Sequence, residues 1–139
     1  MSELQARQDA EHLKLLSIFH YVVAAMMALF GCFPIIHLVV GIAMVSGGFG
    51  HAKVGEPSPA LFGWLFVVAA ATFILTAWTL AVCTLVAGRN LARRKRYLFC
   101  LVVAAIMAAM CMPFGTILGV FTIVVLMRPS VKESFGVPA

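Results

Sequence analysis

Residues 88–97 read Gly-Arg-Asn-Leu-Ala-Arg-Arg-Lys-Arg-Tyr and hold five of the ten basic side chains of the protein. Long runs without Asp, Glu, Lys or Arg lie on either side, at residues 57–88 and 97–127, and a third covers residues 15–52. The three runs are roughly 32, 31 and 38 residues long, and about 20 apolar residues suffice to cross a bilayer. Because hydrocarbon offers no partner to free N–H and C=O groups, the runs must be helical. The sequence therefore predicts an all-α, polytopic transmembrane bundle.

The overall composition supports this interpretation. Of 139 residues, 63% are hydrophobic and only 11% are charged, whereas a soluble domain carries about 25% charged residues. A chain of this length is expected to form one domain. We therefore expect residues 1–139 to be a single transmembrane helical domain.

The basic cluster predicts which side of the membrane faces the cytoplasm. Lys and Arg are enriched in cytoplasmic loops, so Arg89, Arg93, Arg94, Lys95 and Arg96 mark such a loop. Each basic residue near the surface attracts anionic lipid head groups with about 1 kcal/mol. The expected partner of this loop is the lipid bilayer, and no nucleic-acid partner is expected.

Two proline-containing breaks interrupt the first and last apolar runs, at Gly31-Cys-Phe-Pro34 and Met112-Pro-Phe-Gly115. Proline lacks the N–H group and breaks or kinks a helix. One straight helix over residues 15–52 would be about 57 Å long, against about 30 Å of hydrocarbon. We therefore predict two Pro-broken hairpins around a long central helix, giving four to five membrane segments. The expected helices are residues 14–31, 34–47, 60–87, 97–112 and 114–127.

The alternative is that each break only kinks a single span. The hairpin arrangement puts the N-terminus outside and the C-terminus inside. Arg128 and Lys132 favour that placement of the C-terminus, whereas Arg7 and Lys14 oppose that of the N-terminus. The choice between hairpin and kink, and the sidedness of the N-terminus, stay open.

A polar stripe follows the third expected helix. Thr72, Thr76, Thr79 and Cys83 are spaced i, i+4, i+7 and i+11, which places them on one helix face. Hydroxyl and small side chains in lipid usually face another helix. The stripe therefore indicates helix packing, with the lining of a solute path as the functional alternative.

Two histidines, His20 and His37, lie within the first apolar run. Neither a straight helix nor a hairpin would bring both into one ligand plane, so no haem, other cofactor or metal is expected. A neutral imidazole bonded to a carbonyl is the simplest interpretation. His37 is a candidate pH-sensitive residue.

Several small residues and cysteines complete the pattern. Gly115 and Gly119 form a GxxxG pair that allows two helices to pack closely, within the subunit or between subunits. Cys32 and Cys111 lie next to the two breaks, and no disulfide is expected between them. Their depth and oxidation state stay open.

Three stretches carry a resemblance: Phe62-Gly-Trp64, Arg93-Arg-Lys-Arg-Tyr97 and Met112-Pro-Phe-Gly-Thr-Ile-Leu-Gly-Val-Phe-Thr122. With these, residues 12–135 resemble a group of small bacterial multi-pass membrane proteins of unassigned function. The resemblance implies the bacterial cytoplasmic (inner) membrane and no particular activity. The chain is not similar to the small multidrug transporters, which carry an intramembrane glutamate.

The uncharged runs exclude several classes of function. Acid–base catalysis and ion-coupled transport usually need an intramembrane carboxylate, Lys or Arg, and no Ser-His-Asp set, phosphate loop or HExxH motif is present. We therefore expect a non-enzymatic protein. A structural or accessory subunit of a membrane assembly is the favoured interpretation, as a homo-oligomer or bound to another membrane protein. The alternative is a self-associating, channel-like protein that gives a small or neutral solute a passive path.

Overall fold

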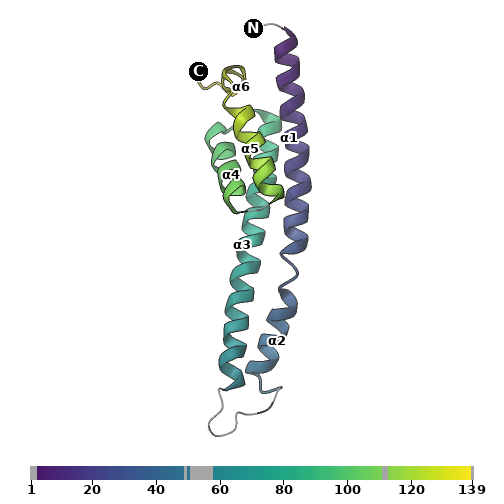
Figure 1. Ribbon diagram of the computed structural model, residues 1–139, viewed down its shortest axis with the longest axis vertical. Helices are drawn as coiled ribbons and strands as arrows, with labels where there is room; N and C mark the ends of the chain where they lie inside the picture. The colour runs from purple at the N-terminus through teal and green to yellow at the C-terminus, as the bar shows by residue number, and fades with distance from the viewer. Residues whose placement is uncertain (1–2, 49, 51–57, 111–112, 139) are drawn as a thin grey trace. The chain divides into compact units, whose positions relative to one another are not determined.

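A computed structural model describes residues 3–48, 50, 58–110 and 113–138. The helices are α1 (Glu3–Phe30), α2 (Ile35–Val45), α3 (Pro59–Arg93), α4 (Tyr97–Met110), α5 (Phe114–Leu126) and α6 (Pro129–Ser134) (Figure 1). These described residues form no strand, so the predicted all-α class is confirmed. Two helical runs, Glu3–Val45 and Pro59–Arg93, are long and apolar enough to cross a membrane.

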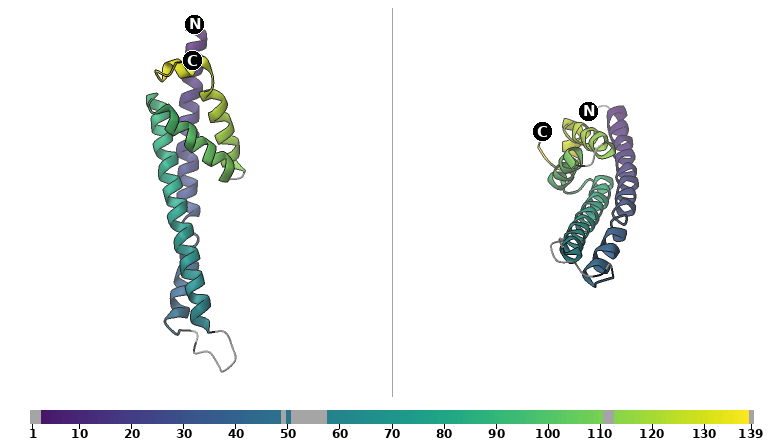
Figure 2. Two further views of the ribbon diagram at one scale, coloured as in Figure 1. Left: turned by 90° about the vertical axis from the view of Figure 1, so that its left-hand side faces the viewer. Right: turned by 60° about the horizontal axis from the view of Figure 1, so that its bottom comes forward.

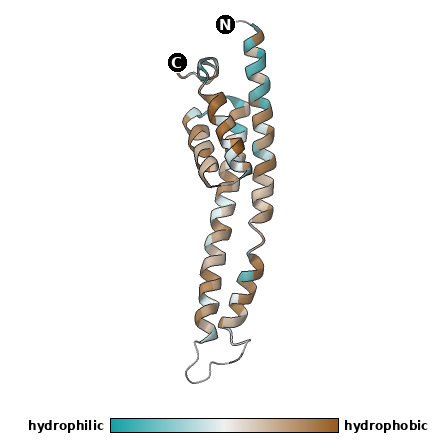
Figure 3. Ribbon diagram, viewed as in Figure 1, coloured by the Kyte–Doolittle hydropathy of each residue, from teal (hydrophilic) through white to brown (hydrophobic). Residues whose placement is uncertain are grey.

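The apolar surface of these runs is mostly exposed. Only 17% and 11% of their most apolar 18-residue windows are buried inside the protein, whereas the core helix of a soluble protein is mostly buried. Hydrophilic residues gather in the first turns of α1 and in α6, and brown apolar segments cover most of the other helices (Figure 3). Soluble proteins rarely expose apolar patches larger than a few hundred Å², so this surface suits a lipid environment.

The chain divides into two compact units, which are described separately. Unit 1 comprises Met1–Met26 and Ala81–Ala139, and unit 2 comprises Met27–Leu80. Unit 1 thus holds most of α1, the end of α3 and all of α4, α5 and α6. Unit 2 holds the end of α1, all of α2 and the greater part of α3.

The core of unit 1 is built from small and medium apolar side chains of α1, α3, α4, α5 and α6. Fully or nearly fully buried are Leu13, Leu16, Ala24, Ala87, Leu91, Cys100, Val103, Ala104, Met107, Leu118, Val125, Leu126 and Val131. Gly88 lets α1 approach α3 closely, because a Cβ there would lie 3.2 Å from the carbonyl oxygen of Ser17. The glycine expected to start a loop therefore packs two helices together.

Helices α4 and α5 form an antiparallel pair in unit 1 (Figure 2). The hydroxyl of Thr116 donates to the carbonyl of Ala108 at 3.0 Å, and the hydroxyl of Tyr97 donates to that of Leu126 at 3.1 Å. A Cβ on Gly119 would lie 2.7 Å from the backbone nitrogen of Ala108. The second proline break therefore joins two helices that fold back on each other, as the hairpin prediction requires. The expected helix end at residue 112 lies outside the described residues.

The prediction of a hairpin at the first break is wrong. In unit 2 a Cβ on Gly31 would lie 3.1 Å from Ala77 Cβ, and a Cβ on Gly41 would lie 2.9 Å from the carbonyl oxygen of Gly63. The chain therefore runs on past Pro34 along α3 in one direction and does not turn back. The break is a kink because the path stays nearly helical. Pro34 has φ −69° and ψ −3°, and the N–H of Leu38 donates to its carbonyl at 3.0 Å.

We predict that Gly41→Leu destabilises unit 2. The new side chain would collide with α3, and overpacking of this kind costs about 1–3 kcal/mol. Val39→Leu is the matched control, because Val39 is exposed on the same helix. The free energy of unfolding of the purified protein in detergent measures both changes. Equal stability of the two variants would contradict the packing of α2 on α3.

Three helix boundaries differ from the sequence prediction. α3 continues to Arg93 and not to residue 87, because Ala87 and Leu91 point into the core of unit 1. α1 begins at Glu3 and includes the charged approach segment without interruption. The tail after Met127 contains α6, which starts with Pro129 at a position where proline is well tolerated.

Candidate functional site

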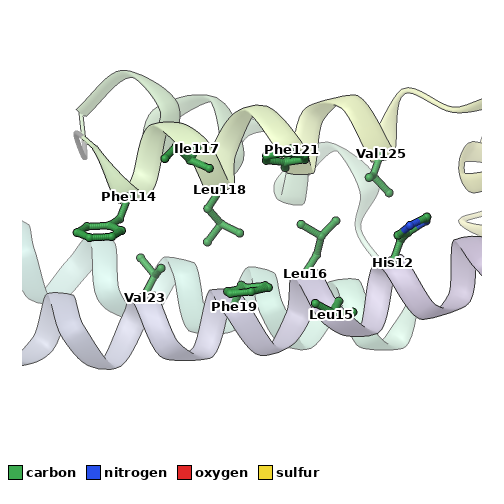
Figure 4. Close-up of a pocket in the computed structure, with 10 residues that line it drawn as sticks. All are labelled: His12, Leu15, Leu16, Phe19, Val23, Phe114, Ile117, Leu118, Phe121 and Val125. Atoms are coloured by element: carbon green, nitrogen blue, oxygen red, sulfur yellow. The ribbon is translucent and has the colours of Figure 1, made fainter.

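An apolar groove runs between α1 and α5 inside unit 1 (Figure 4). Both helices contribute side chains spaced i, i+3, i+4, i+7 and i+11, so each presents a single face. The lining residues are His12, Leu15, Leu16, Phe19 and Val23 of α1 and Phe114, Ile117, Leu118, Phe121 and Val125 of α5. The groove has a volume of about 380 Å³, which is within the range of small-molecule sites.

The groove has a buried floor and two exposed walls. Leu16, Leu118 and Val125 are buried and form the floor. The walls are formed by Leu15 and Phe19 on one side and by Phe114, Ile117 and Phe121 on the other, all of them exposed. The floor is held by the core of unit 1, whereas the walls open to the surroundings. A slender apolar group can therefore enter from the side.

A polar cluster lies just beyond one end of the groove, which we call its mouth. His12 lies beside Val125 at this end, and Val23 lies near Phe114 at the other (Figure 4). One turn beyond His12, Asp9 Oδ1 pairs with Arg128 Nη1 at 3.2 Å. Asp9 Oδ2 accepts a hydrogen bond from the Ser130 hydroxyl. Both carboxylate oxygens are therefore in use, whereas the Arg128 side chain is 44% exposed and a guanidinium carries five N–H donors.

A second, polar pocket of about 220 Å³ gathers three parts of unit 1 at one end. Its lining residues are Ala6, Asp9 and Leu13 of α1, Arg94 after α3, and Ser130, Glu133 and Ser134 of α6. The beginning of α1, the basic turn and the C-terminal helix therefore meet. The sequence left the sidedness of the N-terminus open, and in unit 1 the first turns of α1 and α6 lie at the same end.

Buried polar side chains line the helix contacts of unit 1. The Ser17 hydroxyl donates to the carbonyl of Gly88 at 2.8 Å, and the Thr84 hydroxyl contacts Met107 Sδ at 3.2 Å. His20 is fully buried, and its Nδ1 lies 2.8 Å from the carbonyl oxygen of Leu16. This contact with a backbone carbonyl is the one expected for a histidine in an apolar run. Within the described part of the chain, no three His, Cys, Asp or Glu side chains are grouped to hold a metal ion.

The threonine stripe, defined as Thr72, Thr76 and Thr79, is exposed in unit 2. Each hydroxyl donates to the carbonyl four residues earlier in α3, at 2.8, 2.8 and 2.7 Å. The stripe lies on the side of α3 away from α2, because Thr72 is nine residues and about 180° from Gly63. Cys83, the fourth member of the predicted stripe, belongs to unit 1 and is half-buried.

His37 lies between two aromatic rings of unit 2. Its ring centroid is 6.1 Å from that of Phe33 and 6.0 Å from that of Phe66, with an interplanar angle of 13° to the latter. In unit 2, α2 runs along α3 toward its beginning at Pro59, so His37 lies on the stretch that follows the kink.

The predicted basic residues Arg89, Arg93, Arg94, Lys95 and Arg96 are all exposed. Arg89 and Arg93 lie on α3, so only the last three form the turn to α4. Arg94 and Arg96 have φ angles of 51° and 52°. This left-handed conformation is uncommon for residues other than glycine, and it makes the reversal between α3 and α4 tight.

The remaining predicted residues have structural positions. Gly115 is buried in α5, and Pro113 precedes that helix with φ −89° and ψ −24°. The Cys32 thiol is exposed and lies 3.3 Å from the carbonyl oxygen of Ala28. Cys111 lies outside the described residues.

Sequence reasoning missed the groove and its mouth. The equal spacing of the lining residues on the two helices could have been recognised in the sequence. The pairing of Asp9 with Arg128, which are 119 residues apart, could not have been recognised there. Comparisons of the chain with family models, with curated proteins and with solved structures each find no match.

Proposed function

We propose that this protein is a non-enzymatic, multi-pass accessory subunit of the bacterial cytoplasmic membrane, which binds another membrane helix through the outer face of α3. One observation carries the proposal: the threonine stripe is a face of small side chains that the chain itself leaves uncovered. Small residues let helices approach closely in lipid, where exclusion of water contributes nothing to their association.

The hydrogen bonding of the stripe supports packing over a solute path. All three hydroxyl donors are already bonded to carbonyls of α3, so a passing solute would have to compete for them. Packing of a partner helix does not require free hydroxyl donors. It requires only that the side chains on this face be small. The partner is a second copy of this chain or a different membrane protein.

The proposal includes a topology with two complete crossings. The kinked run Glu3–Val45 crosses outward, and α3 returns to the cytoplasm, where the basic turn lies. Helices α4 and α5 have 14 and 13 residues, or about 20 Å each, against about 30 Å of hydrocarbon. They enter from the cytoplasmic side and return to it. The Thr116 hydroxyl donates a hydrogen bond to the carbonyl of Ala108 near the break, where lipid would offer no donor.

We predict that Thr76→Leu abolishes association. A Leu at the centre of the stripe keeps a second helix at a distance, so the protein purified in mild detergent at native expression level loses its oligomer or its co-purifying partner. Val82→Leu is the control, because Val82 is exposed and lies about 120° around α3 from Thr76.

Two results would contradict the accessory role. One is a wild-type protein that purifies as a monomer without partners. The other is association that survives Thr76→Leu unchanged. Flux of a neutral solute into liposomes that is lost in Thr76→Leu would favour the solute path instead.

A further inference from the structure

We propose that the groove between α1 and α5 binds one acyl chain of an anionic phospholipid, with the phosphate held at the mouth by Arg128. This site is separate from the basic turn, where the sequence alone predicts a general attraction to head groups. It is also independent of the threonine stripe, so either proposal can fail without the other.

The size and shape of the groove fit an acyl chain. Eleven residues separate its first and last lining positions on each helix, which corresponds to a length of about 16 Å. A helix with its side chains is about 10 Å across, which is much wider than a single hydrocarbon chain. A helix of a partner would therefore rest on the walls and leave the floor empty. A slender, flexible hydrocarbon chain reaches Leu16 and Leu118.

Under the topology proposed above, the direction of the groove fits a lipid of the cytoplasmic leaflet. Its polar mouth lies at the end of unit 1 where the basic turn and α6 meet, and its other end is wholly apolar, at Val23 and Phe114. A lipid that lies with its tail along α1 therefore has its head group beside His12 and Arg128.

The net positive charge of unit 1 and the Arg128 guanidinium favour an anionic head group. Unit 1 contains nine basic residues against four acidic ones, all outside its chargeless runs: Arg7, Lys14, Arg89, Arg93, Arg94, Lys95, Arg96, Arg128 and Lys132 against Glu3, Asp9, Glu11 and Glu133. Asp9, the acid nearest the mouth, is only 14% exposed and is occupied by Arg128 and Ser130. The planar fork of Arg128 matches the oxygens of a phosphate group. The ion pair with Asp9 holds that fork in place.

The test is a lipid titration followed by native mass spectrometry. The full-length protein in a neutral detergent is titrated with dioleoyl phosphatidylglycerol or with dioleoyl phosphatidylcholine, which differ only in the head group. We expect the wild type to retain one phosphatidylglycerol, about fivefold more tightly than phosphatidylcholine.

Two pairs of variants separate the tail site from the head-group site. Ile117→Trp fills the groove and weakens both lipids about tenfold, if the indole excludes about two methylene groups. Val120→Trp adds a similar volume on the exposed side of α5 and leaves binding unchanged. Arg128→Gln lowers the affinity for phosphatidylglycerol to that for phosphatidylcholine, whereas Arg93→Gln, an equal charge change at the end of α3, shifts it less than twofold. Far-UV circular dichroism and the thermal midpoint show that each variant is folded.

Three outcomes would overturn the proposal. An equal loss of lipid affinity in Ile117→Trp and Val120→Trp would mean that lipid binds the surface without using the groove. Equal loss in Arg93→Gln and Arg128→Gln would mean that only the summed charge attracts the head group. The wild type could also form a dimer that binds no lipid. If Ile117→Trp dissociates that dimer, the occupant of the groove is a second copy of the chain.

Discussion

Replacement of Gly119 by Leu is expected to separate α5 from α4. A Cβ at this position already meets the backbone of α4, at the Ala108 nitrogen and at the carbonyl oxygen of Ala104. Backbone cannot move aside as a flexible side chain can, so the hairpin must open or shift. The expected cost is about 1–3 kcal/mol or more.

The buried thiol of Cys100 reports this opening. It lies at 0% exposure in the core of unit 1, so a membrane-permeant maleimide reacts with it only when this core opens. We expect its labelling rate to rise about 10- to 100-fold in Gly119→Leu. Val120→Leu, at the neighbouring exposed position, should leave the rate unchanged. An unaltered rate in Gly119→Leu would show that α4 and α5 are not packed through this glycine.

Both ends of the chain are expected to react from the cytoplasmic side only. In unit 1, Asp9 contacts Arg128 and Ser130, and Arg94 lines a pocket with Ala6 and Glu133. These contacts require the first turns of α1, the basic turn and α6 to be on one side of the membrane. In a cysteine-free background, the substitutions Glu3→Cys, Arg93→Cys and Ser134→Cys should be labelled by a charged maleimide in inside-out vesicles and protected in right-side-out ones.

The control for this experiment is Ser58→Cys, just before α3. Because α3 has 35 residues and is about 52 Å long, its two ends lie on opposite sides of a membrane that it crosses. Ser58→Cys should therefore be labelled in right-side-out vesicles and protected in inside-out ones. If Glu3→Cys is labelled together with Ser58→Cys from the outside, the kinked crossing is wrong and the first break is a hairpin after all.

The sequence was a good guide to the helices and a poor one to their connections. Charge-free runs and proline breaks predicted helices close to the observed α2, α4 and α5, because backbone hydrogen bonding depends on local composition. Length alone suggested a reversal at Pro34. Whether a proline kinks or ends a helix depends on what receives the following segment, and Gly41 could be matched with Gly63 only in three dimensions.

The candidate sites show the same division. The threonine spacing identified one face of α3, since helical periodicity is a local property. The sequence left open whether that face is covered by another helix of the chain. The contact of Asp9 with Arg128 depends on the approach of α1 to the end of α5, and no spacing in the sequence encodes it. α6 was missed because a helix of six residues gives too short a pattern.

The turn after α3 places Arg94 and Arg96 in a backbone geometry that glycine adopts without penalty and that costs other residues about 1–2 kcal/mol each. The chain thus keeps arginine where the finished fold would be more stable with glycine. Orientation is decided while a nascent chain is being inserted, before the helices have packed, and positive charge is what retains a loop on the side of synthesis. In the proposed topology, these two side chains would help to hold the turn in the cytoplasm during insertion, which is a role in biogenesis and not in the folded protein.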